Sequence, residues 1–201
     1  MTIELKYSIK PLDYDECIKI LERRVNDVFF GNKRELLWIL EHKTVYTGGT
    51  SSNQKDIIDE NIKIIKTKRG GKHTVHSPGQ KVVYFVLNLN KRKKDIRNLV
   101  SQIENCIINI LKEYNITSYS DKENIGVWVK KKKIAAIGIR VKKWIAYHGF
   151  SLNVSNDLTK YESIIPCGIK DKSITSLKEL GINSYQDINE IIAKEFLNTF
   201  S

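Results

Sequence analysis

The chain has 201 residues, of which 41% are hydrophobic and 28% are charged, and its formal net charge at pH 7 is +11. These values fit a soluble globular protein with a sizeable core, and we expect a single domain spanning residues 1–201. No apolar run approaches the length of a membrane span, and the N-terminal residues lack a signal-peptide pattern. Three cysteines without framework spacing argue against disulfides, so we expect a cytoplasmic protein with no membrane partner.

The excess of 34 basic over 23 acidic residues favours an anionic partner. An acidic protein and a nucleic acid are both candidates, and a general lysine-rich composition is the third interpretation. The lysines are scattered, and no basic stripe interleaved with aromatic residues is present. We therefore expect no nucleic acid partner.

The first predicted element is a helix that begins at Asp13, which forms a capping-box pattern with Glu16. Apolar residues at spacings of three and four define its buried side: Cys17, Ile18, Leu21, Val25 and Phe29. Gly31 ends the helix. Residues 35–40 read as a strand, and residues 42–52 are expected to form a loop.

The central part of the chain predicts a buried strand over residues 80–89, where Val82-Val83-Tyr84-Phe85-Val86-Leu87 forms a short β-rich apolar run. A charged loop, residues 91–94, leads into a second amphipathic helix. Its buried side is predicted to carry Leu99, Ile103, Cys106, Ile107, Ile110 and Tyr114.

Three closely connected strands follow, over residues 125–130, 134–141 and 145–154. An amphipathic helix from about residue 185 to residue 200 closes the chain. Helices and meandering strands thus alternate irregularly. This order predicts an α+β domain with a mixed, largely antiparallel sheet flanked by helices.

Residues 69–80, directly before the central strand, read Arg-Gly-Gly-Lys-His-Thr-Val-His-Ser-Pro-Gly-Gln. Three glycines and a proline in twelve residues indicate close approach of the backbone to a ligand. The segment is neither a Walker loop nor a dinucleotide fingerprint, because Gly-Lys-Ser/Thr is absent and no helix follows. An ordinary turn before a strand is the alternative to a binding loop.

A run of four lysines, residues 130–133, precedes Ile134. Alternation places Lys133 at the end of an apolar strand face with Ala135 and Ile137, where burial would ease the loss of its proton. The alternative is that all four lysines lie at an exposed hairpin tip.

A histidine precedes a glycine at His148-Gly149 inside a predicted strand, a pattern typical of a bulge or a ligand contact. A hydrogen-bonded core histidine is the simpler interpretation. A zinc site formed by Cys167, His73, His76 and His148 has only weak support, because paired ligand spacing is missing.

Cys167 differs from the other two cysteines, which fall within helical apolar spacing. It lies in Ile164-Ile165-Pro166-Cys167-Gly168-Ile169, between a residue that fixes the backbone and one that frees it. Such a turn can present a thiol to a substrate. Covalent catalysis by a thiolate is therefore our first hypothesis.

Four segments between about residue 40 and residue 177 resemble, in order, those of the lipoyl(octanoyl) transferase family. They are Glu41-His42-Lys43-Thr44-Val45-Tyr46-Thr47; Arg69-Gly70-Gly71 with Thr74, His76 and Pro78-Gly79-Gln80; Lys133-Ile134-Ala135 with Gly138, Arg140 and His148-Gly149; and Pro166-Cys167-Gly168-Ile169. The chain departs from the family pattern at Lys43-Thr44, Lys72, Val75 and Ser77. These departures concern the pocket rather than the chemistry.

The resemblance implies a fold similar to the catalytic domains of lipoate ligases and biotin protein ligases. It also implies a catalytic pair, Cys167 and Lys133, with no metal and no cofactor. The family positions near the substrate are Arg69, Gly70, Gly71, Thr74, His76, Gly138, His148, Gly149 and His42. His73 matches no family histidine.

The implied reaction moves an octanoyl group from octanoyl-acyl carrier protein to a lysine of lipoyl domains, through a thioester on Cys167. The implied acceptors are the lipoyl domains of 2-oxoacid dehydrogenase complexes and the glycine cleavage H protein. Lys133 would handle the proton, and backbone amides near Cys167 or Gly70-Gly71 are candidate oxyanion donors. An ATP-dependent lipoate ligase is the alternative enzyme, and a basic nucleic-acid-binding module is the alternative of another class.

Overall fold

The computed structural model describes residues 3–165 and 173–201. Its largest element is a seven-stranded sheet with β1 and β2 parallel and the other neighbouring pairs antiparallel. In order across the sheet, the strands are β1 (Glu4–Tyr7), β2 (Leu36–Leu40), β6 (Gln80–Asn88), β10 (Ile145–Asn153), β9 (Lys132–Lys142), β8 (Val127–Val129) and β7 (Tyr119–Ser120). The predicted α+β class with a mixed, largely antiparallel sheet is confirmed.

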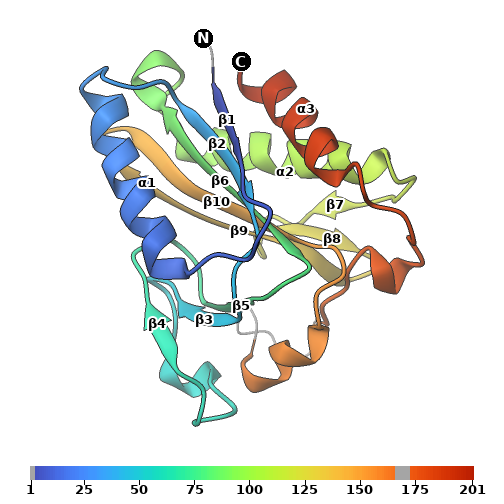
Figure 1. The fold of residues 1–201 in the computed structure, drawn as a ribbon. Helices are drawn as coiled ribbons and strands as arrows, with labels where there is room; N and C mark the ends of the chain where they lie inside the picture. The colour runs from blue at the N-terminus through green and yellow to red at the C-terminus, as the bar shows by residue number, and fades with distance from the viewer. Residues whose placement is uncertain (1–2, 166–172) are drawn as a thin grey trace.

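A second, three-stranded sheet lies beyond one end of the first (Figure 1). Its strands, in order, are β4 (Ile64–Lys66), β3 (Val45–Gly48) and β5 (His73–His76). The predicted loop over residues 42–52 is therefore wrong in part, since β3 lies within it, and the expected binding loop contains β5. Strands β3 and β5 pair with each other, and each is only four residues long. Neither contains an apolar run like that of the central strand, so the sequence pattern did not predict them.

Helix α1 (Tyr14–Phe29) covers one face of the large sheet (Figure 1). The Asp13 side chain caps it by accepting a hydrogen bond from the backbone N–H of Glu16 (3.2 Å), as the capping pattern predicts. Cys17, Leu21 and Val25 are buried as predicted, whereas Phe29 is 39% exposed and Val28 is buried in its place. The helix reaches the sheet three residues after Val25 rather than four.

Helices α2 (Ile96–Lys112) and α3 (Ile188–Phe200) cover the opposite face (Figure 1). The predicted buried side of α2 is confirmed within the helix, whereas Tyr114 lies beyond its last turn. Short 3₁₀ helices connect the elements: η1 (Gln54–Asp56), η2 (Leu89–Lys91), η3 (Leu158–Ser163) and η5 (Lys178–Leu180). In the part of the chain that is described, no helix is both long and apolar enough to cross a membrane.

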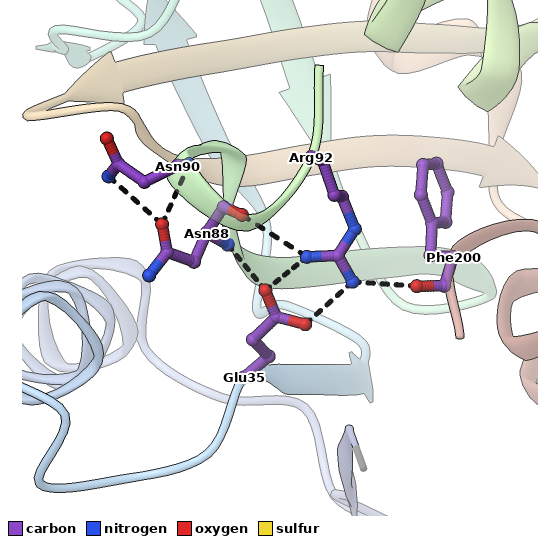
Figure 2. Close-up of polar contacts among 5 residues, drawn as sticks. All are labelled: Glu35, Asn88, Asn90, Arg92 and Phe200. Carbon is purple, nitrogen blue, oxygen red and sulfur yellow. Dashed lines mark hydrogen bonds and ion pairs between the residues drawn. The ribbon is translucent and has the colours of Figure 1, made fainter. Parts of the chain in front are cut away.

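A buried polar cluster ties the end of α3 to the sheet (Figure 2). The Glu35 carboxylate accepts hydrogen bonds from the backbone N–H of Asn88 (2.6 Å) and from both terminal nitrogens of Arg92. Nη2 of Arg92 also donates to the carbonyl of Phe200 (2.7 Å), one of the helix-end carbonyls that lack a partner within the helix. One guanidinium thus joins β2, β6 and the C-terminal helix.

Candidate active site

A cavity of about 490 Å³ opens where β9 and β10 meet the three-stranded sheet. Most of the predicted site residues line it: Arg69, Gly70, Gly71, Thr74, His76, Lys133, Gly138, His148 and Gly149. Its size lies in the range of small-molecule pockets. Residues far apart in sequence therefore converge on one hollow.

Among the predicted site residues that the structure describes, only His42 does not line the cavity. His42 is fully buried one layer away, and its Nε2 lies 2.8 Å from the hydroxyl of Tyr84, which does line the cavity. Cys167 lies outside the described residues.

Lys133 is only 6% exposed, unlike the lysines before it. Lys130 and Lys131 form the exposed turn between β8 and β9, with φ of +46° and +67°. The exposed-tip interpretation thus holds for them and fails for Lys133. Its Nζ lies 5.1 Å from the ring centroid of Trp128, and the Lys133 side chain lines the cavity.

The chain on both sides of the segment that contains Cys167 runs along this cavity. After it, Ile174 forms a parallel bridge with Lys133, whose backbone N–H donates to the Ser173 carbonyl (2.9 Å). Before it, Tyr161 lines the cavity, and the backbone N–H of Ile165 donates to the Asp56 carbonyl (2.7 Å). The flank after the segment is therefore fixed at the strand that carries Lys133, and the flank before it is fixed at Asp56.

Arg69 holds the glycine loop against β9 and β3. Its guanidinium donates to the carbonyl and hydroxyl of Thr47 (3.1 and 2.7 Å) and to the Gly70 carbonyl (3.0 Å). A side chain at Gly138 would meet Arg69 Cδ at 3.1 Å, so glycine allows the loop to pack there. The N–H of Gly70 donates to the Ile139 carbonyl (3.0 Å), so this amide already has a partner, while an oxyanion role for Gly71 or for the amides near Cys167 stays a prediction.

His148 departs from strand geometry. Strict alternation along β10 would place it on the face of Ala146 and Phe150, under α2 and α3. Its φ of +69° instead sets the ring against Tyr147 and Tyr84 on the α1 face, with centroids 4.9 and 6.3 Å away. The register with β6 and β9 is continuous, so the expected bulge is absent. Such a backbone is costly for a residue other than glycine and is typical of functional sites.

Three neutral histidines lie beside the cavity. Burial lowers the pKa of His42 to about 4 and that of His76 to about 3, and for His76 the neighbouring His42 adds to the effect. Burial, followed by the positive charge of Arg69, lowers the pKa of His148 to about 3. The rings of His42 and His76 lie 5.7 Å apart. At neutral pH they supply hydrogen-bonding groups but no charge.

Hydrogen bonds assign the tautomer of His76. Its Nδ1 lies 2.6 Å from Oε1 of Gln80, while the Gln80 amide nitrogen donates to Asn153 and to the hydroxyl of Tyr161 (both 2.9 Å). Oε1 is therefore an acceptor and Nδ1 carries the proton. Nε2 of His76 keeps a lone pair that can accept a proton or a hydrogen bond.

Sequence analysis missed several residues of this site. Tyr84 and Tyr161 line the cavity, and so does His73, which was given little weight. Tyr84 left a signal, because a tyrosine inside the aliphatic run over residues 82–87 needs a hydroxyl partner when buried. Tyr161 left none, since it reaches the site only through the fold.

The zinc interpretation gains no support from the geometry. Within residues 3–165 and 173–201, no three His, Cys, Asp or Glu side chains gather as metal ligands would. The described wall instead combines an amine, the neutral imidazoles of His76 and His148 and apolar side chains of β9 and α2. This combination suits binding of an apolar chain and proton transfer.

Comparison with known proteins identifies the family. Residues 13–197 match the model of the lipoyl protein ligase A/B catalytic domain. The chain is 43% identical over 206 residues to an octanoyltransferase of Ehrlichia canis (strain Jake), covering 99% of this chain and 96% of that relative. An octanoyltransferase of Anaplasma phagocytophilum (strain HZ) is also 43% identical, with full coverage of both chains.

Solved structures agree on the fold. A putative lipoate protein ligase from T. acidophilum with bound lipoic acid matches with a TM-score of 0.76 and 13% identity, over 99% of this chain and 86% of that one. The biotin acetyl coenzyme A carboxylase synthetase of Helicobacter pylori matches with a TM-score of 0.57 and 12% identity, over 98% and 75%. The expected fold is confirmed, and the chain belongs to the octanoyltransferases, a family of acyltransferases.

Proposed function

We propose that this protein transfers an octanoyl group from octanoyl-acyl carrier protein to a lysine of lipoyl domains. Cys167 is the nucleophile and carries the acyl group as a thioester between the two half-reactions. The acceptors are the lipoyl domains of 2-oxoacid dehydrogenase complexes and the glycine cleavage H protein. The name of the full-length relatives supports octanoyl as the transferred group.

One observation carries the proposal: the chain that immediately follows the Cys167 segment pairs with Lys133. Ile174 bridges Lys133, and the backbone N–H of Thr175 donates to the Lys133 carbonyl (3.0 Å). The buried amine and the described flank of the thiol segment therefore share one wall of the cavity. This arrangement supports a Cys/Lys pair.

In the first half-reaction, the pair begins as a Cys167 thiolate and a Lys133 ammonium. The thiolate attacks the carbonyl carbon of the donor thioester. The donor thiolate leaves and takes a proton from Lys133. The products are an octanoyl thioester on Cys167, a free donor thiol and a neutral Lys133 amine.

In the second half-reaction, a neutral lysine of the lipoyl domain attacks the Cys167 thioester. The nitrogen must lose a proton as the amide forms, and the neutral Lys133 amine accepts it. Cys167 leaves as a thiolate, which restores the starting pair. One thioester is exchanged for another and then for a more stable amide, so no ATP is needed.

The apolar side chains of the cavity suit the acyl chain. Ile96, Val100, Ile137, Ile139 and Phe150 all line it. Burying six or seven methylene groups contributes about 5 kcal/mol at roughly 0.8 kcal/mol each. Binding of the octanoyl chain therefore depends on apolar contacts, while its transfer depends on Cys167 and Lys133.

The net charge of +11 fits an acidic donor protein, because a basic surface speeds the approach of an acidic one. Three cysteines, an odd number, also fit a reducing compartment such as the cytoplasm.

The test combines octanoyl-acyl carrier protein, this protein and a lipoyl domain, and follows the mass of the lipoyl domain. We expect a gain of one octanoyl group (~126 Da) that is lost when Cys167 is replaced by alanine. A lipoyl domain whose target lysine is replaced by arginine is the control acceptor. Transfer from octanoate plus ATP, with none from the thioester, would instead establish a ligase.

A further inference from the structure

Glu104 is a buried carboxylate on the side of α2 that packs on the sheet. It is 8% exposed, and its neighbours in the helix, Ile103 and Ile107, belong to the apolar core. Carboxylates are seldom buried unless they have a partner, because the charged form loses its solvation. Its position therefore calls for a charge or donor nearby.

Gly126 joins Glu104 to Lys133. Its backbone N–H donates to Oε1 of Glu104 (3.3 Å). On its other side, a side chain built at Gly126 would lie 2.4 Å from Cε and 3.1 Å from Nζ of Lys133, so the lysine occupies the space that a side chain would need. The same glycine thus touches the carboxylate and the end of the lysine.

Two charged groups, Lys133 and Asp121, and the Gly126 amide act on the pKa of Glu104. Burial raises its pKa, while the Gly126 amide and then the positive charge of Lys133 act in the opposite direction. Asp121, in the segment before β8, raises that pKa slightly further. Lys133 on β9 is therefore the cation that faces this carboxylate, and it faces the cavity on its other side.

We propose that Glu104 is a positioning residue, which holds the ammonium form of Lys133 against Gly126 at the cavity wall. This inference rests on the proposed role of Lys133 in proton transfer. Glu104 does not touch the substrate. It sets the pH at which Lys133 gives up its proton and the direction in which the amine points.

The second half-reaction isolates this effect, because the octanoyl-enzyme carries no thiolate. The octanoyl-enzyme is formed first, and its transfer rate to a lipoyl domain is then measured from about pH 6 to about pH 11, a range that includes the reference pKa of a lysine side chain, roughly 10.4. The acidic limb of that profile reports loss of protons from Lys133 and from the acceptor lysine, and a shift between variants reports Lys133. The acceptor lysine titrates identically in every variant.

Glu104→Gln keeps an acceptor for Gly126 but removes the charge. We expect the acidic limb to move to lower pH by roughly one unit, because a neighbouring negative charge no longer stabilises the ammonium. Glu104→Asp restores the charge and should return the limb toward the wild-type position. Glu195→Gln, which removes a buried carboxylate on α3, is the matched control and should leave the limb unchanged.

Glu104→Asp also guards against a folding defect, since it shortens the side chain while keeping the charge. If Glu104→Gln has the wild-type limb, or if Glu104→Asp moves it as far as Glu104→Gln does, the positioning role is wrong. Failure of the proposed function is a separate result. It would appear as a wild type that forms no octanoyl-enzyme, or as a Lys133→Met variant with the wild-type profile.

Discussion

The two faces of the large sheet come from the same strands but differ in chemistry. The face under α2 and α3 is packed mainly with apolar side chains. The face under α1 is apolar near Val86 and Tyr147, but toward the cavity Tyr84 of β6 meets His42 and His76 from neighbouring segments. Strand periodicity accounts for the first face. The second depends on buried polar groups and on a backbone that breaks the alternation.

The change between the two kinds of face occurs at His148 and Gly149. The positive φ of His148 places its ring on the α1 face, and Gly149, the next residue, has no side chain. β10 therefore packs in the core along most of its length and lines the cavity at His148 and Gly149. The following changes test that division, from the largest expected effect to the smallest.

Gly149→Ala should cause the largest loss of stability, because it adds a side chain where the two faces of the sheet differ. The new Cβ would lie 1.9 Å from the carbonyl oxygen of Val83 on the neighbouring strand β6. Because two paired backbones cannot separate locally, we expect a loss of more than about 4 kcal/mol in the free energy of unfolding. Urea unfolding measures it.

Gly181→Ala is the control for backbone conformation. Gly181 has φ of +83° with open space around it, so this change should cost only about 1 kcal/mol. Equal losses for the two variants would mean that the contact with Val83 is not limiting.

Arg92→Met tests how α3 is held on the apolar face. The change leaves the Glu35 carboxylate buried without its cation and frees the Phe200 carbonyl (Figure 2). Removing one member of a buried pair typically costs about 3–5 kcal/mol. We expect that loss in urea unfolding and earlier hydrogen exchange in α3. Arg97→Met, at an exposed position of α2, should change neither; a stable Arg92→Met would show that packing alone holds the helix.

His148→Asn tests the polar face through its response to acid. The pKa of His148 is lowered to about 3 in the folded protein, below the ordinary value of 6.5. Between these values the unfolded chain binds a proton that the folded protein does not, so stability falls as the pH falls. Without this histidine, the loss between pH 7 and pH 4 should be smaller by roughly 3 kcal/mol. Urea unfolding at both pH values checks this.

Asparagine is chosen because it tolerates positive φ. His148→Val also removes the titrating group, but it should destabilise the protein at both pH values because a β-branched residue does not tolerate positive φ. If the stability of His148→Asn depends on pH as that of the wild type does, the lowered pKa of His148 is not the cause of the acid sensitivity.

The smallest effect is expected outside both faces. Lys194 of α3 lies 2.8 Å from the carboxylate of Glu113, just after α2, with both side chains exposed. Solvent screens such a pair. Lys194→Gln should leave the thermal midpoint unchanged, and a clear drop would show that the two helices depend on this contact.

The parts of the fold that follow a repeating pattern were predictable. The helix capped by Asp13, the strand over residues 80–89 and the helix bearing Ile103 and Ile107 each bury many apolar groups at regular spacing. The short strands β3 and β5 were not, because their pairing partners lie far apart in sequence and because Val75 of β5 is buried with Tyr161 and Ile164 from a distant part of the chain.

The site divides in the same way. Lys133 and the Arg69 loop could be assigned because their motifs are local. Tyr161 and Glu104 could not, since each becomes relevant only when distant segments meet at the cavity and at Gly126. The tilt of His148 onto the α1 face was also hidden, because alternation predicts the opposite face.

The most direct test of the account is whether the octanoyl group is held by Cys167. Wild type, Cys167→Ala and Cys106→Ala are incubated with octanoyl-acyl carrier protein, and the intact mass of each is measured. Cys106 is the matched control, because burial raises the pKa of its thiol to about 12.

We predict a hydroxylamine-labile gain of about 126 Da on wild type and Cys106→Ala, and none on Cys167→Ala. An adduct that persists in Cys167→Ala would contradict the account. So would a lipoyl domain that is still octanoylated by Cys167→Ala at the wild-type rate.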